Sequence, residues 1–316
     1  MFLFSIPHEV DEQYIQQVRD LVSPMEVIVQ ADVHEKNVPL DKVEIFLTYG
    51  QNVDKETLEK MPSLKWIQIF QTGVEQLPLE ELKKRNILLT NIQDFHSIPI
   101  AEYVLTTMLY FTRSIPKYLH LQKNQDWDRT EKDQEIYEKT VAIFGAGKIG
   151  QVVAERCRLL GMHVIGVNTT GQPRPNFDEV FPMSQKHEVL KKSDYVVLLL
   201  PATKDTYHAF GKEEFEKMKN TSYLINVGRG TLINQEELAE CLENEVIRGA
   251  ALDVTDPEPL PKDHFLWETK NVLITPHMAS ITNRYIERAL EKVTLNWNAY
   301  KSGETPPYSI DLDRGY

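Results

Sequence analysis

Cysteine is scarce in this chain of 316 residues, which has only Cys157 and Cys241, and the two show no paired spacing. A disulfide framework needs several cysteines at regular spacings, so a reduced, cytoplasmic setting is the better expectation. The nine histidines are scattered along the sequence. We therefore expect no metal site.

Long apolar runs and an excess of basic charge are also missing. No apolar run approaches the roughly 20 residues that a membrane-spanning helix needs. Residues 1–7 begin apolar but include no basic residue, so we expect a first strand there rather than a signal peptide. The 47 acidic and 35 basic residues give a net charge of −12. This balance argues against nucleic acid or an anionic membrane as the main partner.

The chain does contain short apolar runs that alternate with amphipathic stretches. Strands are predicted in the first half at Phe2–Ile6, Glu26–Val29, Val43–Thr48, Trp66–Phe70 and Ile87–Asn91. They are predicted in the second half at Val141–Phe144, Val164–Val167, Tyr195–Leu200, Tyr223–Val227, Ala250–Val254 and Val272–Ile274. Several runs are apolar without alternation, as in parallel strands buried on both faces. The pattern predicts an α/β protein with two doubly wound parallel sheets.

A long helical stretch, Ile98–Leu121, separates the two sets of strands, and this helix and a second one at Thr282–Tyr300 are expected to cross between the two domains. Shorter helices are expected at Asp11–Val22, Lys55–Met61, Ile149–Leu160 and Glu236–Leu242. The predicted domains are therefore residues 1–97 with 283–316 and residues 98–282, each a doubly wound unit. The tail from residue 301 onward is expected to return to the first domain.

A glycine motif opens the second domain. Gly145, Gly147 and Gly150 form G-x-G-x-x-G directly after a predicted strand, and a helix and another strand follow. In such a loop the glycines allow a tight turn, close approach to a pyrophosphate, and close helix–strand packing. The phosphates bind at the helix N-terminus, which here carries Lys148 and Ile149. This context predicts dinucleotide binding. Residues 98–282 are therefore expected to be a Rossmann domain that binds NAD(P), and residues 1–97 with 283–316 a flavodoxin-like substrate domain.

The residues after the second strand of this unit bear on which dinucleotide binds. An acidic residue there normally holds the ribose 2′-OH of NAD, but this chain has Asn168, followed by Thr169 and Thr170. Uncharged side chains do not repel a 2′-phosphate, and Arg174 is close in sequence. NADP is therefore favoured over NAD. The alternative, that Asn168 bonds the 2′-OH of NAD, stays open.

An arginine, a glutamate and a histidine each follow an apolar strand of the second domain: Arg229, Glu258 and His277. Ligands of open α/β sheets bind at the carboxyl ends of the strands. Arg229 can bind a carboxylate and stabilise charge on a keto oxygen, and His277 can donate a proton beside Glu258. Asp253 is expected to hold the nicotinamide carboxamide or ribose. The glycines that flank Arg229, Gly228 and Gly230, would let the cofactor approach, and Val227 and Gly228 belong to the expected cofactor set.

Four motifs in this order, G-A-G-K-I-G, N-V-G-R-G, D-V-T-D-P-E-P-L and T-P-H-M-A-S, resemble those of the D-isomer-specific 2-hydroxyacid dehydrogenases. The resemblance spans nearly the whole chain. It implies that Arg229, Glu258 and His277 are the catalytic set and that a small 2-keto or 2-hydroxy acid is the substrate. Members are usually dimers through the cofactor domain, so a homodimer is expected.

Further segments match the same family. The first-domain stretch Phe70–Glu75 resembles the loop whose backbone N–H groups at Gly73 and Val74 bind the substrate carboxylate. His96–Tyr103 resembles the start of the interdomain helix, and Pro201 with Thr206 resembles a loop along the cofactor. The ending Asp311–Tyr316 resembles the glyoxylate/hydroxypyruvate reductase branch, which is often NADPH-dependent.

Several alternatives remain at this point. Tyr49 either closes over a small substrate or is an exposed loop residue. The main reading is an oxidoreductase that transfers a hydride between NAD(P)H and a 2-keto acid. A dinucleotide-sensing corepressor of the same fold is the alternative from another functional class. Formate and phosphite dehydrogenases rank low because those lineages generally carry glutamine in place of Glu258 or have other dedicated inserts.

Overall fold

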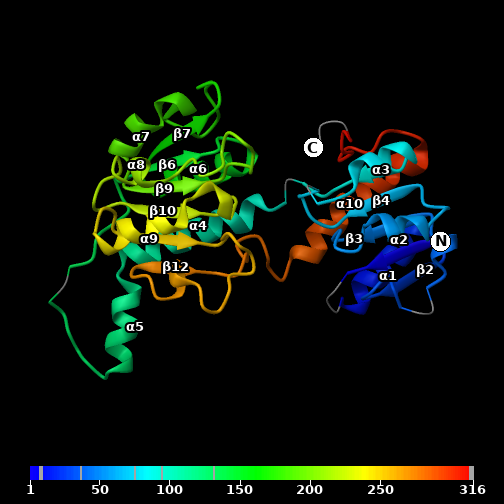
Figure 1. Ribbon diagram of the computed structural model, residues 1–316, viewed down its shortest axis with the longest axis horizontal. Helices are drawn as coiled ribbons and strands as arrows, with labels where there is room; N and C mark the ends of the chain where they lie inside the picture. The colour runs from blue at the N-terminus through cyan, green and yellow to red at the C-terminus, as the bar shows by residue number, and fades with distance from the viewer. Residues whose placement is uncertain (7–9, 36–37, 75, 94, 131, 313–316) are drawn as a thin grey trace. The chain divides into compact units, whose positions relative to one another are not determined.

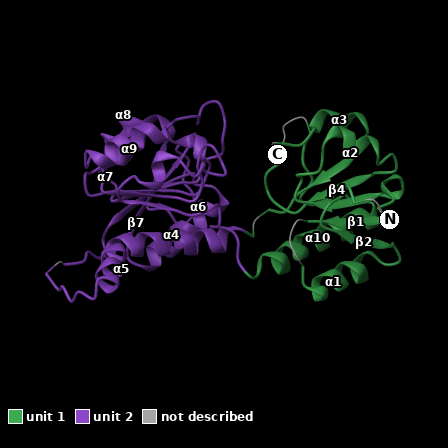
Figure 2. Ribbon diagram, turned by 60° about the horizontal axis from the view of Figure 1, so that its bottom comes forward, with its two compact units in different colours: residues 1–95, 283–316 green, residues 96–282 purple. Residues whose placement is uncertain are grey.

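A computed structural model of the chain describes residues 1–6, 10–35, 38–74, 76–93, 95–130 and 132–312. These residues form two compact units, residues 1–95 with 283–316 and residues 96–282 (Figure 2). The first stretch of the first unit ends at residue 95, two residues before the boundary expected from the sequence, which was 97/98. Glu75 and residues 313–316, which belong to motifs discussed above, lie outside the described residues.

The first unit is built on five parallel strands in the order β2-β1-β3-β4-β5. Their bounds are β1 Phe2–Ser5, β2 Val27–Gln30, β3 Ile45–Thr48, β4 Trp66–Ile69 and β5 Leu88–Thr90. Every residue of β1, β3 and β4 is buried, which explains why their sequences do not alternate. The strand order is that of flavodoxin-like sheets, so the predicted class of this unit is confirmed.

Helices cover both faces of this sheet. They are α1 Glu12–Val22, α2 Lys55–Glu59, α3 Leu79–Lys84 and α10 Tyr285–Ser302, with a 3₁₀ turn η1 at Leu40–Lys42. Phe2 and Phe4 point to the face covered by α1 and α10, and Leu3 between them points to the face of α2 and α3. The period of two residues in a strand therefore divides the apolar side chains between two cores.

The second unit carries seven parallel strands in the order β12-β11-β10-β9-β6-β7-β8 (Figure 1). Their bounds are β6 Thr140–Phe144, β7 His163–Asn168, β8 Glu179–Pro182, β9 Tyr195–Leu198, β10 Tyr223–Asn226, β11 Gly249–Leu252 and β12 Val272–Ile274. The chain order reverses between β6 and β9, which makes that point the switch point of the sheet. The predicted doubly wound class is confirmed. Strand β8 was not predicted, because this half-exposed edge strand has only two apolar residues before its proline.

Its helices are α4 Ser97–Thr112, α5 Ile115–Lys123, α6 Lys148–Leu159, α7 Lys186–Lys192, α8 Lys212–Phe215 and α9 Gln235–Glu243. Short 3₁₀ turns occur at η2 Met183–Gln185, η3 Gly230–Leu232 and η4 Phe265–Trp267. The single long helix predicted over residues 98–121 is wrong, since Ser114 adopts a left-handed conformation (φ 47°, ψ 35°) between α4 and α5. Pro116 in the first turn of α5 is the sequence signal for this break. Proline has no backbone N–H, so it cannot donate the hydrogen bond that a continuous helix would need at this position.

Among the described residues, no helix combines the length and the apolar character required to cross a bilayer. Both cysteines are free and buried. Burial raises the pKa of the Cys157 thiol to about 12, so this side chain packs as a small apolar group.

Candidate active site

Three neighbouring strands of the second unit end side by side. Asn226 of β10 is paired in register with Leu252 of β11, which is paired with Ile274 of β12. Arg229, Glu258 and His277 follow these three strand ends within a few residues. Because parallel strands present their carboxyl ends at one edge, the sheet brings the loops of all three predicted catalytic residues to the same place.

Glu258 and His277 contact each other directly. The ring Nδ1 of His277 lies 2.5 Å from Oε1 of Glu258, and both side chains remain 40–47% exposed. A carboxylate accepts but does not donate, so Nδ1 carries the shared proton when Glu258 is ionised. Nε2 is then the ring nitrogen available to exchange a proton with a substrate. This is the pairing that a general acid needs to keep its orientation.

The loop that carries His277 is organised by Asp253. Asp253 is only 2% exposed, and its carboxylate accepts from Thr275 Oγ1 at 2.6 Å, Met278 N at 2.8 Å and Ala279 N at 2.9 Å. The backbone N–H of His277 donates to the carbonyl of Asp253 at 2.8 Å, and His277 has a left-handed φ of 55°. Asp253 therefore shapes the histidine loop from both its backbone and its side chain, beyond the cofactor contact expected for it.

The turn that carries Arg229 depends on Asn226, which the sequence analysis did not single out. Asn226 is fully buried. Its side chain accepts from Gly228 N at 3.1 Å and donates to the carbonyl of Arg229 at 2.9 Å. Arg229 is half-buried, and its Nη1 donates to the carbonyl of Gly228 at 2.8 Å. The amide side chain thus closes the turn between Val227 and Arg229, and an asparagine that ends a buried strand is the signal that could have revealed it.

His96, just before α4, is a second histidine near this site. Burial, together with the positive charge that His277 can carry, lowers the pKa of His96 to about 4. Its imidazole is therefore neutral at ordinary pH. At ordinary pH, His96 therefore places no second positive charge beside His277.

The glycine loop lies between β6 and α6, at the switch point. A Cβ on Gly150 would stand 2.2 Å from the carbonyl oxygen of Gly145, and one on Gly145 would stand 2.9 Å from the backbone of Leu199. A Cβ on Gly147 would meet no described heavy atom within 4 Å. Two glycines thus serve the packing of the loop, while Gly147 borders open space in front of α6. A helix N-terminus behind a space without side chains fits a dinucleotide pyrophosphate.

Asn168 is engaged inside the loop that follows β7. Its Oδ1 accepts from Gly171 N at 2.6 Å and Thr170 N at 3.0 Å, and its Nδ2 donates to the Gln172 carbonyl at 2.9 Å. Thr169, Thr170 and Arg174 are exposed. The side-chain amide of Asn168 therefore stabilises this loop, a role that the sequence did not predict.

The two remaining predicted cofactor residues, Pro201 and Thr206, lie in one loop after β9. Thr206 Oγ1 donates to the carbonyl of Pro201 at 2.6 Å and accepts from Thr203 N at 2.8 Å. The hydroxyl thus closes the loop on itself. Because β9 lies beside β6 in the sheet, this loop neighbours the glycine loop.

In the first unit, Gly73 and Val74 lie after β4, and Gln71 Nε2 donates to the carbonyl of Tyr49 at 2.8 Å. Tyr49 is half-buried, with its ring against Phe70 and Tyr285 at centroid distances of 5.8 and 6.2 Å. Burial raises the pKa of Tyr49 to about 12. It is thus neither an exposed loop residue nor separate from the core of its unit.

Tyr285, at the start of α10, also supports this loop. Its hydroxyl donates to the carbonyl of Phe70 at 2.9 Å, and its ring packs edge-on against Phe95 at 5.0 Å. Sequence reasoning missed this residue, because only the tertiary fold brings α10 beside the end of β4.

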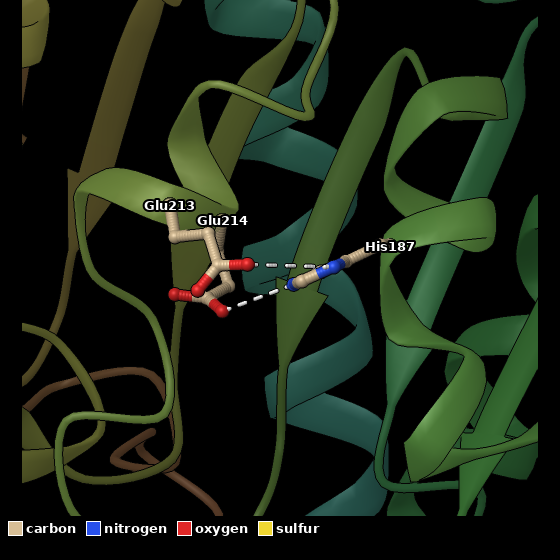
Figure 3. Close-up of side chains that lie close together, drawn as sticks. All are labelled: His187, Glu213 and Glu214. Carbon is tan, nitrogen blue, oxygen red and sulfur yellow. Dashed lines mark hydrogen bonds and ion pairs between the residues drawn. The ribbon is translucent and has the colours of Figure 1, made fainter.

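One further cluster joins His187, Glu213 and Glu214 (Figure 3). Glu214 Oε1 lies 2.8 Å from Lys186 Nζ and 3.2 Å from His187 Nε2, and its Oε2 accepts from Gly211 N at 3.0 Å. Burial raises the pKa of Glu214, but these bonds outweigh it and lower the pKa overall. The lysine supplies the positive charge that this carboxylate requires, so the cluster works as a structural ion-pair network.

Comparison with known proteins identifies the family. The family profile for the NAD-binding domain of D-isomer specific 2-hydroxyacid dehydrogenases matches residues 105–279, more than half of the chain. The glyoxylate reductase of Thermococcus gammatolerans is 32% identical over 272 residues, which cover 84% of this chain and 81% of that protein.

Solved structures agree. A D-isomer specific 2-hydroxyacid dehydrogenase family protein from Aeromonas salmonicida subsp. salmonicida A449 has a TM-score of 0.89 at 29% identity, covering 99% of this chain and 98% of that one. The NADPH-dependent glyoxylate/hydroxypyruvate reductase of Sinorhizobium meliloti, solved with NADP and sulfate, has a TM-score of 0.83 at 26% identity, covering 100% and 99%.

These matches confirm the resemblance read from the four motifs, and they favour the enzyme over the corepressor alternative. The chain is an oxidoreductase that uses a nicotinamide dinucleotide on 2-hydroxy or 2-keto acids, and it belongs to the D-isomer-specific 2-hydroxyacid dehydrogenase family.

Proposed function

We propose that this enzyme reduces glyoxylate, hydroxypyruvate or a similar small 2-keto acid to the D-hydroxy acid. The observation that carries the proposal is the Glu258–His277 pair at 2.5 Å, at the same sheet edge as the Arg229 turn. One relative is a glyoxylate reductase and another is a glyoxylate/hydroxypyruvate reductase, which supports this substrate class.

The reduced nicotinamide supplies the hydride when it is bound. As the carbonyl carbon accepts it, negative charge develops on the oxygen, and the Arg229 guanidinium stabilises that charge. His277 Nε2 then donates a proton to the oxygen, while Glu258 on Nδ1 keeps the ring oriented and favours its protonated form. In the first unit, the N–H groups of Gly73 and Val74 are the proposed donors to the substrate carboxylate.

The proposed cofactor is NADP, bound through Gly145, Gly147, Lys148, Ile149 and Gly150. The amide of Asn168 is hydrogen-bonded at both ends within its own loop, which argues against a dedicated bond to the 2′-OH of NAD. The exposed Thr169, Thr170 and Arg174 offer uncharged or positive surroundings to a 2′-phosphate. Val227, Gly228, Pro201, Thr206 and Asp253 complete the proposed cofactor set.

We also propose a homodimer in the cytoplasm. Helix α5 and the segment after it extend away from the sheet of the second unit (Figures 1 and 2). Leu119 is 55% and Trp127 90% exposed there. Large apolar side chains that a single copy leaves in water favour a protein partner, and a second copy of this chain is the proposed one. Two buried free thiols suit a reducing compartment.

The test is a matrix of 2-keto acids against NADPH and NADH, followed by cofactor absorbance. We expect turnover of glyoxylate or hydroxypyruvate with a higher kcat/KM for NADPH. Arg229→Ala should lower kcat/KM by roughly 10³-fold and His277→Ala by roughly 10²- to 10⁴-fold, with NADPH binding kept. Arg248→Ala, which removes an exposed arginine of the same unit, is the control. Turnover of none of the acids would overturn the proposal, and parent rates in either variant would overturn the site.

A further inference from the structure

Gln235 makes two hydrogen bonds to one residue of the loop that carries Glu258. Its side-chain Nε2 donates to the carbonyl of Asp256, and its Oε1 accepts from the N–H of Asp256 at 3.1 Å. Gln235 is only 9% exposed. A primary amide is the side chain that offers a donor and an acceptor at one end, so it matches the backbone of a single residue.

The loop so held is otherwise exposed. Residues 256–259 all lie at the surface, Glu258 among them, and Thr255 Oγ1 donates to the carbonyl of Pro257 at 3.0 Å. An exposed carboxylate on a loop is free to move into water, where it is well solvated. The 2.5 Å contact between Glu258 and His277 therefore depends on what restrains the loop.

Gln235 also connects this loop to the arginine turn. It is the first residue of α9, which follows η3, and η3 starts directly after Arg229. A Cβ on Gly230 would stand 2.0 Å from the backbone of Thr255, so the two segments are already in close contact there. The two hydrogen bonds from Gln235 to Asp256 form a second connection between the same segments, five residues further along the chain than Gly230.

We propose that Gln235 is a positioning residue that holds Glu258 against His277 and thereby supports proton donation by the imidazole. The inference rests on the proposed roles of Glu258 and His277. A carboxylate held beside an imidazole favours the protonated ring, which is the form that donates the proton in reduction. When the loop is loosened, the carboxylate moves away from Nδ1 of His277 and this support weakens.

The experiment measures the pH profile of kcat/KM for glyoxylate reduction with NADPH in the Gln235→Leu enzyme. Leucine keeps the volume but makes neither bond. We expect the alkaline limb of the profile to move to lower pH by about half a unit or more, and kcat/KM near neutral pH to fall roughly tenfold. Thermal unfolding and NADPH binding report whether the variant is folded, and Gln235→Glu, which keeps one bond, replaces it if it is not.

Asn234→Ala is the matched control. Asn234 precedes Gln235 and caps α9 by accepting from Glu237 N at 3.2 Å, but it makes none of the bonds described to the Glu258 loop. This change should lower thermal stability and leave the pH profile in place. A shift as large as that of Gln235→Leu would mean that any weakening of α9 acts on the site, and it would overturn the proposal.

A double-mutant cycle separates positioning from general damage. In a Glu258→Gln background, Gln235→Leu should cause no further shift of the profile, because the group through which it acts is gone. An equal shift in both backgrounds overturns the inference alone. If Glu258→Gln itself leaves the profile unchanged, the proposed site roles fail and the inference fails with them.

Discussion

Gly147 and Gly150 belong to one motif but meet opposite surroundings. The carbonyl oxygen of Gly145 leaves no room for a Cβ on Gly150, whereas no described heavy atom lies within 4 Å of one on Gly147. The first constraint comes from the packing of α6 on β6. No contact in the described chain requires glycine at position 147, so a bound ligand is the natural reason for a glycine there.

A matched pair of alanine variants tests this distinction. Gly147→Ala should change the free energy of unfolding of the cofactor-free protein by less than about 1 kcal/mol and weaken NADPH binding by about tenfold or more. Gly150→Ala should lower the free energy of unfolding by about 1–3 kcal/mol, because a backbone atom must shift. Denaturant unfolding and NADPH titration measure both. Unimpaired NADPH binding by Gly147→Ala would contradict the proposed phosphate site.

At the scale of elements, α10 and the chain after it are tied to the first sheet by a buried amide. Asn296 of α10 is fully buried. Its Nδ2 donates to Gln68 Oε1 at 2.8 Å and the Asn91 carbonyl at 3.2 Å, and its Oδ1 accepts from Tyr308 N at 3.2 Å. One side chain thus joins β4, the end of β5, and the returning tail, which the sequence analysis expected to rejoin this domain.

Asn296→Ala should therefore lower the free energy of unfolding by about 2–4 kcal/mol, since it removes three bonds and leaves buried partners unsatisfied. Asn298→Ala changes an exposed asparagine of the same helix and should cost less than about 1 kcal/mol. Urea denaturation of both variants gives the comparison. A cost for Asn296→Ala no larger than that of the control would show that the buried network adds nothing.

For the whole molecule, the proposed dimer gives a direct prediction. Leu119→Asp combined with Trp127→Asp places two charges on the exposed surface of α5 and the segment after it, where burying them against a second copy is costly. We expect the mass in solution to fall from that of two chains to that of one. Leu295→Asp, at a leucine of α10 that is 49% exposed, should leave the mass unchanged. A double variant that keeps the parent mass would place the interface elsewhere or exclude it.

Much of the fold of this protein can be predicted from local sequence patterns. Unbroken apolar runs such as Val141–Phe144, the glycine loop and the order of the four motifs were enough to predict both parallel sheets and the family. These signals are local because each depends on residues close in sequence. The errors are local too. Pro116 was overlooked as a helix breaker, and the short edge strand β8 has too few apolar residues to show the pattern of a buried strand.

Other properties depended on partners far apart in the chain. Asp253 accepts from Thr275, Met278 and Ala279, and Gln235 brackets Asp256, across 21 to 26 residues. No sequence spacing predicts such pairs, because the register of β10, β11 and β12 decides which strand ends face one another. Residue types and motif order therefore predicted the chemistry of the site. The hydrogen bonds that hold its loops were decided by the packing of the sheet.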